Sequence, residues 1–245
     1  MMKRLGSFLV ALFVIFATLL SVPVRAAGQP ENKEAMAQRG RVRTPLNLAV
    51  LVQDDLVARV GNELKLTREF IRSLPAGSRV MIGYITSGSL QVRQPFTNDL
   101  EEAAKALRIP AATIAVSPYN PYVEVIEALR KFDAQSEQPN TLLLISDGLD
   151  TSRGADYASA VNTIDLLRAI REAKKREVAV YSFYAPSVGL TSFSRLATTA
   201  GQGALNRLSQ ETGGRAFFQG TSFVSFNPYF EQLRRTLNER YAPIS

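Results

Sequence analysis

The 245-residue chain contains no cysteine, no histidine and no tryptophan. Without cysteine, a disulfide framework, a thiol nucleophile and an iron–sulfur cluster are excluded. Without histidine, the chain cannot supply a Ser-His-Asp triad, an imidazole metal ligand or an imidazole pH switch. Any metal ion would therefore be a hard cation, such as Mg²⁺ or Ca²⁺, bound by oxygen atoms.

Positive charge is also modest once the N-terminus is set aside. The whole chain carries a formal net charge of +7. Residues 1–26 contain three cations and no acid, so their removal leaves +4. The longest remaining basic run, residues 174–176, suits the C-terminus of a helix. No nucleic-acid-binding motif accompanies it, and we expect no nucleic-acid partner.

The first 26 residues have the order of a secretory signal peptide. Residues 1–4 are basic, residues 5–24 are uncharged and mostly apolar, and small residues follow at 26–28. This order predicts cleavage after residue 26 and an extracytoplasmic protein, periplasmic or secreted. The alternative is an uncleaved membrane anchor, because about 20 uncharged residues can span a bilayer. Pro23 and the small residues favour cleavage.

A polar spacer is expected over residues 27–44 and one domain over residues 45–245. Short apolar runs alternate there with amphipathic helical patterns. The alternation predicts an α/β fold in three layers, with a doubly wound, mostly parallel sheet and helices on both faces. Residues 89–93 predict an edge strand that a hairpin joins to the preceding strand. The parallel strands are expected at residues 46–52, 79–85, 141–146 and 178–184.

The sequence also predicts a long helix and a long connection in the second half of the domain. Residues 157–175 predict one helix whose buried face carries Val161, Ile164, Leu167 and Ile170. Residues 185–202 are rich in Gly, Ser and Thr and predict a long connection that is mobile or functional.

Three segments resemble a von Willebrand factor type A (VWA) domain of the secreted bacterial branch. They are PLNLAVLV at residues 45–52, LLLISDGLD at 142–150 and LSQETGGR at 208–215. The resemblance implies a central parallel sheet with one antiparallel edge strand and helices on both faces. It also implies a binding module, typically for protein partners.

VWA domains usually carry a metal-ion-dependent adhesion site, whose first element is Asp-x-Ser-x-Ser after the first strand. The corresponding stretch here is QDDLV at residues 53–57. Glutamine replaces the leading aspartate, and Asp55 and Val57 replace the two serines. The usual threonine falls within residues 117–120, which contain none, whereas the last acid is retained as Asp147. The resemblance therefore implies a degenerate adhesion site.

Asp54, Asp55 and Asp147 are expected to gather at the carboxyl ends of strands, where parallel sheets form ligand crevices. In one interpretation they hold Mg²⁺ or Ca²⁺, with Asn120 or Ser117 as a neutral ligand and Asp55, Asp147 and Ser117 as the main candidates. In the other, the acids only cap turns and accept backbone N–H groups. We favour the second interpretation, because the hydroxyl ligands expected after the first strand are missing.

The predicted function is non-enzymatic binding of an unidentified protein partner outside the cytoplasm, through the rim at the carboxyl ends of the strands. No cofactor is expected, and contact with a membrane only if the N-terminal segment is retained. The alternatives are a Mg²⁺-dependent hydrolase or phosphotransfer site and a structural subunit of an envelope assembly. The candidate contact residues include exposed aromatic anchors and charged groups: Asp54, Asp55, Tyr119, Asn120, Asp147, Phe193 and Arg195.

Overall fold

The computed structural model describes residues 41–86, 88–113, 120–154, 157, 159–218 and 225–241. The predicted signal peptide, most of the spacer and the candidate residues Ser117 and Tyr119 lie outside the described residues. The elements follow one another in this order: β1 (Asn47–Gln53), α2 (Val60–Arg72), β2 (Arg79–Thr86), β3 (Ser89–Thr97), α3 (Leu100–Ala106), α4 (Pro121–Leu129), β4 (Asn140–Ser146), η1 (Ala160–Asn162), α5 (Ile164–Lys175), β5 (Val178–Tyr184), η2 (Leu190–Ser192), α6 (Arg195–Glu211), β6 (Ala216–Phe217) and α7 (Asn227–Arg240).

The strands form one sheet in the order β3-β2-β1-β4-β5-β6. All neighbouring strands run parallel except β3, which pairs antiparallel with β2 at the edge of the sheet. The predicted mostly parallel sheet with one antiparallel edge strand is therefore confirmed. The sequence underestimated β3, which extends to Thr97.

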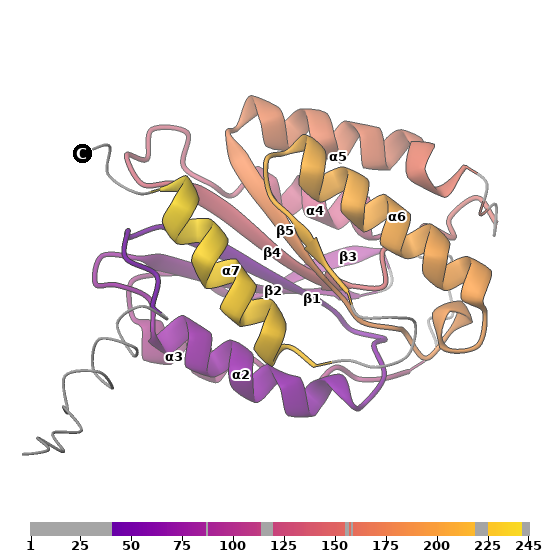
Figure 1. Ribbon diagram of the computed structural model, residues 1–245, viewed down its shortest axis with the longest axis horizontal. Coiled ribbons are helices and arrows are strands. Elements are labelled where there is room, and N and C mark those ends of the chain that lie inside the picture. The colour runs from indigo at the N-terminus through magenta and orange to yellow at the C-terminus, as the bar shows by residue number, and fades with distance from the viewer. Residues whose placement is uncertain are drawn as a thin grey trace, which may run out of the picture.

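Helices cover both faces of the sheet (Figure 1). The helices α2, α3 and α7 pack on one face, and α4, α5 and α6 pack on the other. In β4, Leu143 and Ile145 face the first layer, whereas Leu142 and Leu144 face the second. Both faces of the central strands are buried, which is why their sequences are apolar without alternation.

The prediction of one helix over residues 157–175 is wrong. The α-helix begins only at Ile164, and the short 3₁₀ helix η1 precedes it. Thr163 has an extended backbone between the two, so the helical phase starts later than the apolar spacing indicated. Ile164, expected inside, is 54% exposed. Ile170 is buried as predicted, together with Leu166, Ala169 and Ala173.

The prediction of a long connection over residues 185–202 is also wrong. Helix α6 begins at Arg195, and the Ser194 side chain caps it by accepting a hydrogen bond from the Ala197 N–H. Gly201 lies inside this helix, where a Cβ atom would overlap the carbonyl oxygen of Asp147. The glycine that favoured a loop therefore serves the close approach of α6 to the end of β4.

The chain is fastened to the domain just before β1. Val42 is buried in the core, the Arg43 N–H donates to the side chain of Asn238, and the Thr44 hydroxyl donates to the Tyr241 carbonyl. Within the described residues, no helix combines the length and apolarity needed to cross a membrane.

Candidate functional site

Gln53, the last residue of β1, joins three parts of the expected site through its side-chain amide. Its Oε1 accepts hydrogen bonds from the Ser146 hydroxyl at 2.5 Å and from the Asp147 N–H at 3.0 Å. Its Nε2 donates to Asp55 Oδ1 at 2.7 Å. The amide is fully buried and bonded at both ends. Gln53 thus ties the carboxyl end of β1 to that of β4.

Asp147 lies beneath the surface, with 3% of the residue exposed. Its Oδ1 accepts the Leu149 N–H, and its Oδ2 accepts the Thr191 hydroxyl, both at 3.0 Å. Burial raises the pKa of Asp147, and hydrogen bonds from Leu149, Ser187, Thr191 and Gln53 oppose part of that rise. Asp147 accepts an N–H of its own turn, as the structural interpretation predicted, and does not reach the rim surface.

Asp55 is partly buried beside Asp147. Burial, and then the negative charge of Asp147, raise the pKa of Asp55 to about 6, against the opposing hydrogen bond from Gln53. The charges that shift this pKa are other acids, Asp147 and Asp54, and not cations. The two carboxylates therefore form a site of unbalanced negative charge.

The loops after β1 and β5 meet over the end of β4. Leu56 and Ser187 form an antiparallel bridge, and the Val188 N–H donates to the Asp55 carbonyl at 2.8 Å. Strand β4 lies between β1 and β5 in the sheet, so these loops cross above Asp147. This crossing accounts for the burial of a residue at the usually open end of a parallel sheet.

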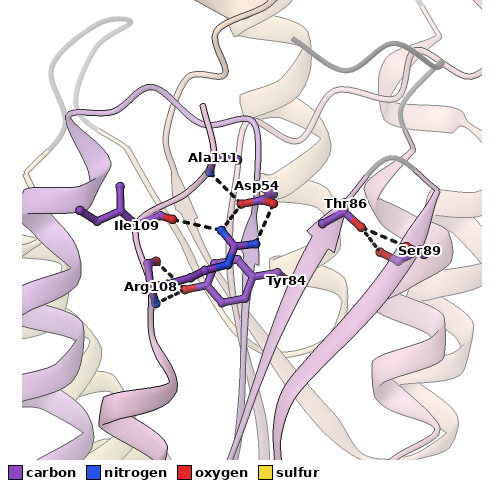
Figure 2. Close-up of polar contacts among 7 residues, drawn as sticks. All are labelled: Asp54, Tyr84, Thr86, Ser89, Arg108, Ile109 and Ala111. Atoms are coloured by element: carbon purple, nitrogen blue, oxygen red, sulfur yellow. Dashed lines mark hydrogen bonds and ion pairs between the residues drawn. The ribbon is translucent and has the colours of Figure 1, made fainter. Parts of the chain in front are cut away.

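Asp54 contacts Arg108 and the residues that follow it. Figure 2 shows its carboxylate against the guanidinium of Arg108, with Nη1–Oδ1 and Nη2–Oδ2 distances of 2.6 and 2.8 Å, and the Ala111 N–H also donates to it. Burial alone would raise the pKa of Asp54, but the hydrogen bonds from Arg108 and Ala111 and the positive charge of Arg108 together outweigh burial, and the pKa is lowered. The guanidinium also lies 4.1 Å from the ring centroid of Tyr84. Asp54 is a structural anchor, not a member of an acidic triad.

Exposed apolar side chains gather at the same end of the sheet. Helices α5 and α6 follow the parallel strands β4 and β5 and begin near their carboxyl ends, and α4 begins beside α5, because its N-cap Asn120 donates to Asp165. Each of the three helices exposes an apolar residue in its first turn. Ile109 follows Arg108, which is bonded to the end of β1, and Phe218 follows β6. We call this surface the carboxyl-end face. Its large exposed apolar residues are Ile109, Val123, Ile164, Phe193, Leu196 and Phe218.

No family model matches the sequence, and no curated protein matches it. Several solved structures are similar. BatB from Bacteroides thetaiotaomicron has a TM-score of 0.55 at 14% identity, over 79% of this chain and 98% of that one. An aerotolerance-related membrane protein from Bacteroides fragilis, with multiple mutations to serines, has a TM-score of 0.53 at 14% identity, over 79% and 99%. The SpRpn10 VWA domain has a TM-score of 0.46 at 12% identity, over 81% and 96%.

The first two likenesses exceed a TM-score of 0.5, and the sheet has the arrangement that the VWA resemblance implied. The chain has a VWA-like fold. At these identities the likenesses bear on the fold alone. The site of the VWA-like domain has to be judged from its own residues.

At the adhesion-site positions of this VWA-like domain, most of the carboxylate oxygen atoms that a cation would use accept a hydrogen bond. Gln53 donates to Asp55, and donors reach both oxygens of Asp147. Asn120 is engaged as the N-cap of α4, and its amide nitrogen donates to Asp165. Among the described residues, no group of three or more acids gathers closely enough to hold a metal ion. Asp55 and Asp147 are the residues that could ligate Mg²⁺ or Ca²⁺, and three of their four carboxylate oxygens already accept a hydrogen bond.

Sequence reasoning missed three contributors to the VWA-like domain's site. Ser187 and Thr191 surround Asp147, and the Ser187 N–H donates to the Thr191 hydroxyl at 2.9 Å. Leu196 is 62% exposed and adds an apolar side chain close to Phe193, which is 75% exposed. The Ser/Thr-rich character of residues 185–202 was the available signal, but no periodicity links Thr191 to an acid in another loop.

Proposed function

We propose that this chain is a non-catalytic protein-interaction module that binds its partner through the carboxyl-end face, without a metal ion. The observation that carries the proposal is the exposure of several large apolar side chains at this one end of the sheet. Apolar and aromatic residues anchor protein interfaces, and contiguous exposed apolar surface marks such sites. Phe193 and Leu196 form the centre of the proposed contact, and Arg195 lies beside them as a charged group suited to interfaces.

The environments of Asp54, Asp55 and Asp147 favour a binding function over a catalytic one in this proposal. Asp147 is covered by the joined loops, and Asp54 is paired with Arg108. A hydrolase or phosphotransfer site would need an accessible, metal-binding acidic cluster. Asp55 remains accessible in part and provides negative charge beside the apolar anchors.

We further propose that the module acts outside the cytoplasm, in the bacterial envelope or after secretion. The signal-peptide order of residues 1–26 supports this location. A structural neighbour described as an aerotolerance-related membrane protein is consistent with it. N-terminal sequencing of the mature protein should find a start after residue 26; a start at Met1 or Met2 would favour a retained anchor.

Site-specific photocrosslinking in cells tests the binding face. A photoreactive phenylalanine analogue at position 193 or 196 should crosslink a partner. The same analogue in place of Arg235, exposed on α7, should not. In a Phe193→Ala/Leu196→Ala variant, the photoreactive analogue is placed at position 109 instead. This variant should no longer crosslink the partner, and its melting temperature should not change. Crosslinking from position 235 alone would place the interface elsewhere, and binding abolished by a chelator would restore the metal-dependent alternative.

A further inference from the structure

One part of the sheet is left without a covering helix. On one face, α3 packs against both β2 and β3, whereas on the other face α4 covers them only in part. A groove of about 440 Å³ lies in the uncovered part. Arg79 begins β2 and Lys131 follows α4, so the groove lies toward the opposite end of the sheet from the carboxyl-end face. Its lining residues are Arg79, Met81, Val92, Pro95, Phe96 and Lys131.

The floor of this groove is apolar. Met81 is buried in the core, and Val92 and Phe96 are partly buried against the same core cluster. The Phe96 ring lies 5.0 Å from the Phe132 ring, centroid to centroid, which holds it in place along the groove. Pro95 adds an exposed apolar ring. Grooves of this size with apolar walls accommodate one or two apolar side chains.

The rim of the groove is cationic. The Arg79 guanidinium lies over the Phe96 ring at 5.7 Å from the centroid. Lys131 pairs at 3.4 Å with Glu127 one helical turn away, an exposed contact of the kind that contributes little stability. Arg79 and Lys131 are the two cations that line the groove. Against the single acid Glu127 they leave an excess of positive charge beside the apolar floor.

Strand β3, which lies beside the groove, is an edge strand of the sheet. No described strand pairs with its outer side. An edge strand presents backbone N–H and C=O groups that can receive a further strand. Pro95 has no N–H and cannot donate, and the register of β3 on β2 shifts between Val92 and Gln94. Regular pairing is therefore confined to residues 89–92. Val92 ends that stretch and also lines the groove, so an added strand would place its side chains beside the apolar floor.

We propose that β3 and this groove bind an extended acidic segment of a partner protein, which adds to the sheet as a further strand. The segment places an apolar side chain against Met81 and Phe96, and its carboxylates pair with Arg79 and Lys131. A second copy of this chain is a poorer occupant. Its β3 carries the cation Arg93 and no acid, so it offers no carboxylate to Arg79 and Lys131.

A displayed library of random dodecamer peptides, selected on the purified domain, tests this second binding surface. We expect enriched peptides that combine an apolar residue with flanking acids. The affinity of a labelled enriched peptide, measured by fluorescence polarisation, should fall at least tenfold in the Arg79→Gln/Lys131→Gln variant. The matched control Arg171→Gln, an exposed cation on α5, should change it less than twofold. Hydrogen exchange of the backbone amides of residues 89–92 should slow when the peptide binds.

Three results would overturn the proposal. The first is the absence of an acidic, apolar consensus among the selected peptides. The second is binding that the Arg79→Gln/Lys131→Gln variant retains, or protection that falls outside β3. The third is a concentration-dependent dimer with protected β3 amides, which would assign the edge to a second copy. None of these results decides whether the carboxyl-end face binds a partner. That proposal is tested separately with the Phe193→Ala/Leu196→Ala variant, whose substitutions lie outside this groove.

Discussion

Asp54 and Arg108 form a bidentate ion pair that fixes the segment after α3 against the end of β1. Fork-to-carboxylate pairs are stronger and more directional than single contacts. The pair is only partly exposed, at 15% of the Asp54 side chain and 31% of the Arg108 side chain. Asp54, which was expected in the metal-binding cluster, therefore links the end of β1 to the segment after α3.

Arg108→Met should lower the free energy of unfolding by about 2 kcal/mol, because it leaves a mostly buried carboxylate without its cation. Urea unfolding at neutral pH measures the change. The control Lys105→Met removes an exposed cation whose nearest acid, Glu101, is 3.8 Å away, and should cost under about 0.5 kcal/mol. The Asp54 pKa is lowered in the fold, so the pair's contribution should be lost as the pH falls below about 4. Equal effects of the two variants would contradict this role.

Asp55 should make the domain less stable as the pH rises from about 4 to about 6. Its pKa is raised from 3.8 to about 6, so the folded state binds the proton more tightly than the unfolded state. The stabilisation is complete below the unfolded pKa and is lost as the pH rises through the folded pKa. Relative to Asp55→Asn, the wild type should lose about 1–2 kcal/mol over this interval, since solvent reduces the effect at a half-buried group. The measurement is the urea midpoint of the wild type and of Asp55→Asn at several pH values across this interval. If the midpoints of the two proteins change equally with pH, the prediction is refuted.

Gln53→Asp should create the Mg²⁺ dependence that we expect the wild type to lack. The change removes the amide that donates to Asp55 and brings a third carboxylate to the site. Without a cation, repulsion should lower the melting temperature. A hundredfold excess of Mg²⁺ over its dissociation constant should return about 2–3 kcal/mol. Calorimetric titration and thermal melting measure both effects, with Gln53→Asn as the control. A saturable Mg²⁺ shift in the wild type, abolished by Asp147→Ala, would instead show an intact adhesion site.

Gly201→Ala should destabilise the domain by about 2–3 kcal/mol, because the added Cβ meets the backbone carbonyl of Asp147 and α6 must move away. The control is Gly203→Ala, two residues along the same helix. Its Cβ meets only a Val161 side-chain carbon at 3.1 Å, and alanine favours the helix by up to about 1 kcal/mol. Urea unfolding of both variants separates close packing from helix propensity. A loss at Gly203 as large as that at Gly201 would show that the contact with Asp147 is not decisive.

Much of the architecture could be predicted because burial on two faces leaves a clear mark on a strand. The run TLLLIS before Asp147 has no polar residue between Leu142 and Ile145, and the structure buries both sides of it. The predicted alternation with amphipathic helices depends on regular apolar spacing, and α2 and α4 bury side chains at such spacing. Where Gly, Ser and Thr dominate, as in the first half of α6, composition indicated a loop although tertiary packing required small helical residues.

The sequence predicted where the site lies in the fold, but it did not predict how the side chains of the site are arranged. The sequence by itself determined that Gln53, Asp54, Asp55 and Asp147 lie at or just after strand ends, because strand ends are local features of the chain. Only the tertiary structure decided that Asp54 turns to Arg108, that Asp147 lies under two joined loops, and that apolar residues from separate helices share one face. The physical reason is that these contacts join residues tens of positions apart. Their partners are selected by the packing of the sheet and its helices, and no local pattern encodes that choice.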